Sequence, residues 1–141
     1  MLGTNTPFPP FEYYDSQERL VGFDVELIQT LVTRAGYSYE WRDFTDFTAL
    51  LLAVSATGVD IAIGAITIRA DRNASLDFTN PYYESDQGIL KLTSDTANYC
   101  AAADCTVAEL NRTDLVIGAQ AITTSEFWVE DNLPAVVDSN N

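Results

Sequence analysis

Segments with the spacing of amphipathic helices alternate with short strand-like segments through the first 63 residues, and this order leaves few folds open to the chain. A helix is predicted over residues 24–35, because its apolar residues recur at spacings of three and four, and Gly36 then marks its end. A second helix is predicted over residues 46–56, with Thr45 as its N-cap and Gly58 after its last turn.

Strands are predicted on either side of these helices. Residues 37–42 alternate between the two faces of a strand, and residues 59–63 form a short apolar strand of the kind buried in a parallel sheet. The resulting order of strand, helix, strand, helix, strand predicts an open α/β fold, which binds ligands at the carboxyl ends of its strands. The loops that carry Phe8, Phe44 and residues 65–72 all follow strand ends, so we expect them along one edge of the sheet.

The segment after the third strand combines small residues with groups that bind anions. Gly64 and Ala65 let a ligand approach the backbone closely, and Thr67 brings a hydroxyl donor. Arg72 follows with a planar guanidinium, which grips a carboxylate through two parallel hydrogen bonds, whereas Arg69 is interpreted as a surface charge. The pattern predicts a site for a small carboxylate, although a single arginine is more often solvated.

Composition excludes several classes of function. The chain has 7 basic and 21 acidic residues and a net charge of −14, which repels nucleic acids and anionic membrane surfaces. It contains no histidine, which excludes Ser-His-Asp and Cys-His catalysis and most zinc sites, so no metal or cofactor is expected. The first residues lead directly into a strand without a signal peptide, and the start of the chain is therefore expected to be trimmed.

The pattern changes near residues 85–86, where a second globular unit is expected to begin. An extended segment is predicted at residues 87–92 and a short apolar strand at residues 115–119, with one helical turn at 106–110 and a capped helix entry at 123–126. Cys100 and Cys105 are interpreted as a local disulfide, with two free thiols as the alternative. Glycosylation acceptor patterns that begin at Asn73 and Asn111 favour an extracytoplasmic protein.

Three motifs together resemble a known family, the periplasmic solute-binding proteins of the polar amino acid type (bacterial extracellular solute-binding proteins, family 3). They are GFDVEL at residues 22–27, DIAIGAITI at residues 60–68 followed by Arg72, and DFTNPYY at residues 77–83. The resemblance extends to the ligand-binding domain of ionotropic glutamate receptors. It implies an α/β, periplasmic binding protein-like fold of type II, with a nearly complete first lobe over residues 1–85 and a partial second lobe over residues 86–141. Relatives continue past this endpoint, so the chain is expected to be truncated.

The resemblance also implies a set of ligand-binding residues. Two aromatic rings would enclose the ligand's side chain, one backbone group would bind its amino group, and a threonine with an arginine would hold its carboxylate. A further pair of threonines would close over the ligand from the second lobe. In this order the residues are Phe8 and Phe44, then Ala65, then Thr67 and Arg72, then Thr123 and Thr124, with Asn5 where many relatives have an ammonium-binding aspartate. Asn5 lacks that charge, and Ile122 replaces a glycine common in the family.

These expectations leave alternatives open at each position. Phe8 and Phe44 also fit a role in the core, Thr123 and Thr124 also fit helix caps, and Asp24 is interpreted as favouring a helix N-terminus electrostatically.

The function expected is non-catalytic binding of a small carboxylate solute, an amino acid, in an inter-lobe cleft with a hinge near residues 85–88. A membrane permease or a receptor pore would detect the closed state. The alternatives are the extracellular domain of a glutamate-receptor-like channel and a cyclohexadienyl dehydratase-like enzyme with Glu12, Asp46 or Glu126 as its general acid. An uncovered sheet would favour a homodimer.

Overall fold

The computed structural model describes residues 1–95, 97–100 and 105–139 of the chain. It divides into two compact units, Met1–Glu84 and Ser85–Asn141, which are described separately below as unit 1 and unit 2. The division falls one residue before the boundary expected from the sequence. That these units serve as the two lobes of one binding cleft stays a prediction.

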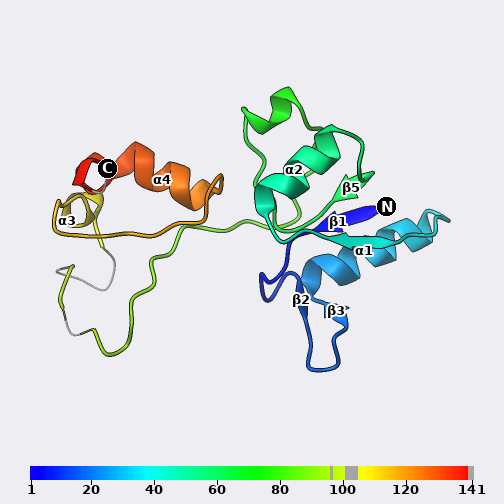
Figure 1. The fold of residues 1–141 in the computed structure, drawn as a ribbon, viewed down its shortest axis with the longest axis horizontal. Helices are drawn as coiled ribbons and strands as arrows, with labels where there is room; N and C mark the ends of the chain where they lie inside the picture. The colour runs from blue at the N-terminus through cyan, green and yellow to red at the C-terminus, as the bar shows by residue number, and fades with distance from the viewer. Residues whose placement is uncertain (96, 101–104, 140–141) are drawn as a thin grey trace. The chain divides into compact units, whose positions relative to one another are not determined.

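A three-stranded parallel sheet forms the centre of unit 1 (Figure 1). Strand β1 (Leu2–Thr4) lies between β4 (Trp41–Asp43) and β5 (Ile61–Ala62), and Leu2 is in register with both Trp41 and Ile61. The outer strands are shorter than the sequence predicts, because β1 offers them only three residues with which to pair. The parallel order agrees with the α/β fold predicted.

Helices α1 (Phe23–Arg34) and α2 (Phe47–Ser55) cover opposite faces of this sheet. Leu2 packs with Ile28 of α1 and with Ile63, and the next residue along β1, Gly3, faces Leu50 of α2. Neighbouring residues of a strand point to opposite faces, so the two apolar clusters are separated by the sheet. A Cβ built on Gly3 would lie 2.8 Å from Cδ1 of Leu50, and the glycine therefore allows α2 to pack closely.

The N-cap of α2 differs from the prediction. Asp46, rather than Thr45, is the capping residue, and its Oδ1 accepts a hydrogen bond of 2.8 Å from the backbone N–H of Ala49. A carboxylate satisfies a free amide at a helix start and also favours the positive end of the helix dipole, which explains why aspartate takes this position.

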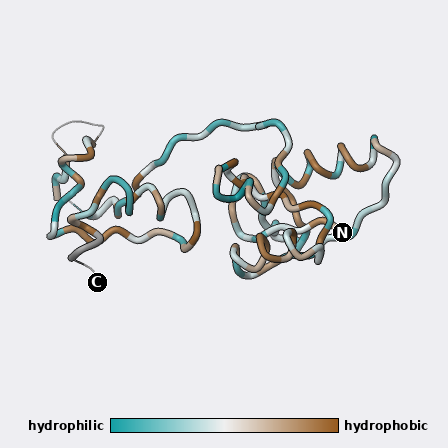
Figure 2. The backbone as a smooth tube through the Cα atoms, turned by 90° about the horizontal axis from the view of Figure 1, so that it is seen from above, coloured by the Kyte–Doolittle hydropathy of each residue, from teal (hydrophilic) through white to brown (hydrophobic). Residues whose placement is uncertain are grey.

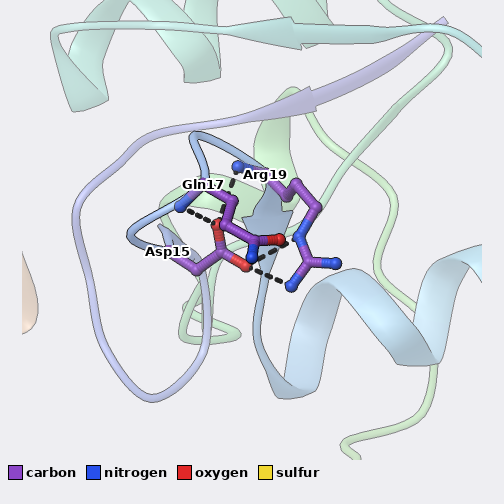
Figure 3. Close-up of polar contacts among 3 residues, drawn as sticks. All are labelled: Asp15, Gln17 and Arg19. Atoms are coloured by element: carbon purple, nitrogen blue, oxygen red, sulfur yellow. Dashed lines mark hydrogen bonds and ion pairs between the residues drawn. The ribbon is translucent and has the colours of Figure 1, made fainter.

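A hairpin of β2 (Tyr13–Tyr14) and β3 (Leu20–Val21) precedes α1. Its turn is organised by Asp15, whose Oδ1 accepts hydrogen bonds from the backbone N–H groups of Gln17 and Arg19 at 2.8 and 3.0 Å (Figure 3). Oδ2 of Asp15 accepts a further bond of 2.8 Å from Nε of Arg19. These bonds, with that from the Arg19 side chain foremost, lower the pKa of Asp15.

The described residues of unit 2 form three helices, α3 (Val107–Leu110), α4 (Thr124–Asn132) and α5 (Pro134–Ser139). Its core consists of Leu110, Leu133 and Val136. Cys100 and Cys105 are joined by a disulfide, with their Cα atoms 5.0 Å apart.

The strand predicted at residues 115–119 is wrong, because this segment forms no strand in the structure, and residues 87–92, predicted to be extended, form none either. A strand needs a neighbour for its backbone groups, and the described part of unit 2 contains no sheet. Leu90 and Val116 are 98% and 84% exposed, so these apolar residues contribute little to the core.

Hydrophobic and hydrophilic residues are interspersed along the chain (Figure 2). Among the described residues, no helix is both long and apolar enough to cross a membrane.

Candidate functional site

The three loops that leave the carboxyl ends of the parallel strands lie along one edge of the sheet, as the sequence predicts. Asn5 follows β1, Phe44 follows β4, and the Gly64–Thr67 bend follows β5. Nδ2 of Asn5 donates a hydrogen bond of 2.5 Å to the backbone oxygen of Phe44, which ties two of these loops together. The sheet topology thus brings Asn5, Phe44 and Ala65 to one edge of unit 1.

The two predicted aromatic walls differ in burial. Phe44 is 9% exposed and packs with Leu50 and Val59, so it takes part in the core of unit 1. Phe8 is 50% exposed and its ring stacks on that of Phe11, with centroids 5.5 Å apart. Phe8 is therefore half accessible and Phe44 is not, and the role of each as a ligand wall stays a prediction.

The bend after β5 contains an unusual backbone conformation. Ala65 has a φ of 46°, in the left-handed region that L-residues rarely adopt. Its backbone N–H donates a hydrogen bond of 2.6 Å to Oδ2 of Asp24, a residue of α1 whose side chain is fully buried. A charge-assisted bond of this kind stabilises the strained bend.

Arg72 lies at the start of a single 3-10 turn, Arg72–Ala74, and is only 6% exposed. Its Nη1 donates a hydrogen bond of 2.9 Å to the backbone oxygen of Thr67, and its Cζ lies 5.4 Å from the centre of the Phe47 ring. Burial, with a smaller effect of Arg69, lowers the pKa of Arg72. The interpretation of Arg72 as a solvated surface charge is therefore wrong, and Thr67 and Arg72 are in direct contact.

A buried acidic group, Glu12, lies beside this edge; the sequence suggested it only as a general acid of the dehydratase alternative and not as a ligand-binding residue. Glu12 is 1% exposed, and burial, followed by the charges of Asp24 and Asp43, raises its pKa to about 8. Among the described residues, none forms a hydrogen bond with Oε2 of Glu12. The hydroxyl of Tyr82 donates a bond of 2.7 Å to Oδ2 of Asp24, and burial is the main cause that raises the pKa of both Asp24 and Tyr82.

The sequence contained one signal for this group. Glu12 and Asp24 are acidic residues within largely apolar and aromatic segments, and Tyr82 belongs to the DFTNPYY motif. The position of Asp24 at the start of α1 suggested an electrostatic role at the helix N-terminus. That interpretation gave no reason to expect its hydrogen bonds to Ala65 and Tyr82.

The remaining predicted residues belong to unit 2. Thr123 is the N-cap of α4, since its Oγ1 accepts a bond of 3.4 Å from the N–H of Glu126 and donates one of 2.7 Å to the oxygen of Gln120. Oγ1 of Thr124 accepts a bond of 3.2 Å from Nε2 of Gln87. Ile122 has a φ of 61°, a conformation that glycine adopts without strain. Closure of Thr123 and Thr124 over a ligand stays a prediction.

One hollow lies elsewhere on unit 1. It has a volume of about 280 Å³ and is lined by Met1, Ser38, Tyr39 and Glu40. These residues precede β1 and β4, so the hollow is at the amino ends of the strands and is separate from the candidate site.

Comparison with known proteins identifies relatives of the chain. The sequence model of the bacterial extracellular solute-binding proteins, family 3, matches residues 1–137. The arginine-binding extracellular protein ArtP of Bacillus subtilis is 36% identical over 90 residues, which cover 64% of this chain and 34% of that protein. A probable histidine-binding protein of Neisseria gonorrhoeae is 33% identical over 89 residues, covering 63% of this chain and 33% of that protein.

A crystal structure shares the fold over nearly the whole chain. It is that of an ancestral amino acid-binding protein, a precursor of cyclohexadienyl dehydratase, with a TM-score of 0.83 and 27% identity over 95% of this chain and 57% of that one. The chain spans about a third of the length of the two curated relatives described above.

Proposed function

Because the chain belongs to the bacterial extracellular solute-binding proteins, family 3, we propose that it binds a free amino acid outside the cytoplasm and does not change it chemically. One observation supports this most directly. The buried guanidinium of Arg72 donates a hydrogen bond to the backbone oxygen of Thr67, in the loop that leaves the carboxyl end of β5. A buried cation held in a fixed orientation is suited to a carboxylate, since little side-chain entropy is lost on binding.

Each group at the edge has a proposed part in binding. Arg72 and the hydroxyl of Thr67 hold the ligand's carboxylate, and the backbone oxygen of Ala65 accepts from its amino group. The exposed ring of Phe8 lies against the ligand's side chain. Asn5 supplies an uncharged oxygen near the amino group, while Phe44, Thr123 and Thr124 complete the site when unit 2 closes.

The net charge of −14 favours a cationic amino acid among the candidates, since an acidic surface attracts cations and repels anionic ligands. The two relatives described above are an arginine-binding protein and a probable histidine-binding protein. We therefore propose a basic amino acid as the solute and a transporter permease as the partner that receives it. The relatives are binding proteins, and this supports transport over a receptor role.

The positions of the three candidate acids argue against a dehydratase. Asp46 caps α2, and Oε2 of Glu126 accepts a bond of 2.6 Å from the N–H of Ile122. Glu12 has a raised pKa, but its carboxyl group is buried against Gly64 in the bend after β5.

Isothermal titration calorimetry of the 141-residue chain with L-arginine, L-histidine, L-glutamine and L-glutamate tests the proposal. We expect saturable binding of a basic amino acid and weaker or no binding of L-glutamate. Arg72→Ala should abolish the heat of binding, and Arg72→Lys should weaken binding at least about tenfold, because lysine lacks the planar fork.

Arg34→Lys is the matched control, since Arg34 is exposed at the end of α1. Circular dichroism shows whether each variant is folded. Unchanged affinity in a folded Arg72→Ala variant, or no binding of any of the four amino acids, would contradict the proposal.

A further inference from the structure

One carboxylate oxygen in unit 1 accepts hydrogen bonds from two segments that are distant in sequence. Oδ2 of Asp24 accepts from the backbone N–H of Ala65 at 2.6 Å and from the hydroxyl of Tyr82 at 2.7 Å. Asp24 is 0% exposed, so neither bond competes with solvent as a surface bond does. The carboxylate thus connects the bend after β5 with the segment that ends unit 1 at Glu84.

The bond to Ala65 determines which backbone group of this residue is available to a ligand. The N–H of Ala65 is occupied by Asp24, which leaves the carbonyl oxygen as the group that can accept from a ligand's ammonium. The left-handed φ of 46° persists only where the surroundings hold it. Removing the acceptor on Asp24 should therefore let the bend relax and move that carbonyl.

The bond from Tyr82 also restrains the orientation of the Asp24 carboxylate. Tyr82 lies two residues before the end of unit 1, and its ring is 6.1 Å from that of Phe23, the first residue of α1. Without the hydroxyl of Tyr82, the buried carboxylate of Asp24 keeps the Ala65 N–H but loses its bond to Tyr82, and it is free to change its rotamer.

We propose that Asp24 is a positioning residue that couples the ligand-binding bend at Ala65 to the Tyr82 segment leading into unit 2. The inference rests on the proposed function, because that function assigns an amino acid ligand to the bend at Ala65. Asp24 and Tyr82 do not touch the ligand. They act by holding the Ala65 carbonyl in the geometry that accepts the ammonium group, and a displacement of the Tyr82 segment alters that geometry through the shared oxygen.

Two measurements on the 141-residue chain test this coupling, with Tyr82→Phe, Asp24→Asn and the double variant. The first is hydrogen exchange at the Ala65 amide in the ligand-free protein. The second is calorimetric affinity for L-arginine and L-histidine. Tyr82→Phe should accelerate exchange at Ala65 and weaken binding, each about tenfold. In the Asp24→Asn background, Tyr82→Phe should have no further effect on either quantity, because the hydroxyl acts through the carboxylate.

Tyr83→Phe is the matched control, since it removes a hydroxyl from the adjacent, 57% exposed residue. It should leave both quantities within about twofold. A merely structural role would lower the stability of Tyr82→Phe without the non-additive loss of affinity. Unchanged Ala65 exchange, unchanged affinity, or additive effects in the double variant would overturn the coupling.

The two measurements separate this inference from the proposed function. If the unmodified chain binds none of the amino acids tested, the proposed function fails, and the coupling to ligand binding fails with it. If the chain binds L-arginine or L-histidine but Tyr82→Phe binds equally well, the proposed function stands and the coupling is overturned. Should Asp24→Asn not fold, the comparison of Tyr82→Phe with Tyr83→Phe still decides the outcome.

Discussion

The carboxylate of Glu12 lies directly against Gly64: a Cβ built on that glycine would be 3.0 Å from Oε1 of Glu12. A side chain at position 64 would displace the carboxylate or the bend that follows it. The close approach keeps Glu12 buried, and its pKa of about 8 means that it carries a proton in the native protein at neutral pH.

The raised pKa of Glu12 predicts that the stability of unit 1 falls as the pH rises. Between its unfolded value of 4.5 and its folded value of about 8, Glu12 binds a proton in the native state and releases it on unfolding. The contribution is fully present below pH 4.5 and is lost as the pH passes through 8, with a slope of at most about 1.4 kcal/mol per pH unit. Urea denaturation followed by the fluorescence of Trp41, in a Trp128→Phe background, measures it.

Glu12→Gln should remove this slope and be more stable than the parent protein at pH 8. Glu26→Gln changes an exposed acid on α1 and serves as the control, with the slope retained. Equal pH dependence in Glu12→Gln and the parent would contradict the assignment.

Gly22 and Gly36 should respond differently to alanine although both have positive φ values, 134° and 82°. A Cβ on Gly22 would collide with the backbone carbonyl of Phe11, which itself accepts a bond of 3.0 Å from the N–H of Asp24. A Cβ on Gly36 would meet nothing within 4 Å. We expect Gly22→Ala to lower the free energy of unfolding by about 3 kcal/mol or more, and Gly36→Ala by about 1 to 2 kcal/mol. Urea denaturation of the two variants compares them, and equal losses would count against the collision.

Thr123→Ala should destabilise unit 2 by about 1 kcal/mol, because the N-cap of α4 is lost. Thr123→Ser retains the hydroxyl and should be close to the parent protein. The fluorescence of Trp128 in a Trp41→Phe background reports on unit 2. Thr113→Ala, at an exposed position outside the helices, is the control and should change little. A loss of stability equal in Thr123→Ser and Thr123→Ala would show that the hydroxyl is not the cause.

Replacing Cys100 and Cys105 together by serine should lower the free energy of unfolding of unit 2 by about 2 kcal/mol, the value expected for a bridge that closes a loop of this size. Treating the parent protein with dithiothreitol should give the same loss. Thiol titration of the unreduced, denatured chain should detect no free thiol, and two free thiols would disprove the bridge.

The helices of unit 1 could be predicted closely because their signal is local. The apolar spacing predicted residues 24–35 and 46–56, and the structure has Phe23–Arg34 and Phe47–Ser55. The strand predicted in unit 2 is wrong, because a strand depends on a partner as well as on local composition. Leu115–Ala119 has the composition of a buried strand, but composition does not supply a partner, and the segment remains without one.

The candidate site was predictable as far as topology determines it. Parallel strands end at one edge, so Asn5, Phe44 and Ala65 had to lie there once the strand order was correct. The burial of Arg72 and the bond between Asp24 and Tyr82 depend on contacts between distant segments, and no local pattern of the sequence contains them.

The central position of β1 affects how unit 1 folds while the chain is being synthesised. Residues 2–4 leave the ribosome long before either neighbouring strand, since their partners are residues 41–43 and 61–62. At about 5 to 20 residues per second, the middle strand waits roughly 3 to 12 seconds for the second of these neighbours. During that interval its backbone groups are available to other chains, so a chaperone that shelters the nascent segment should raise the yield of native protein.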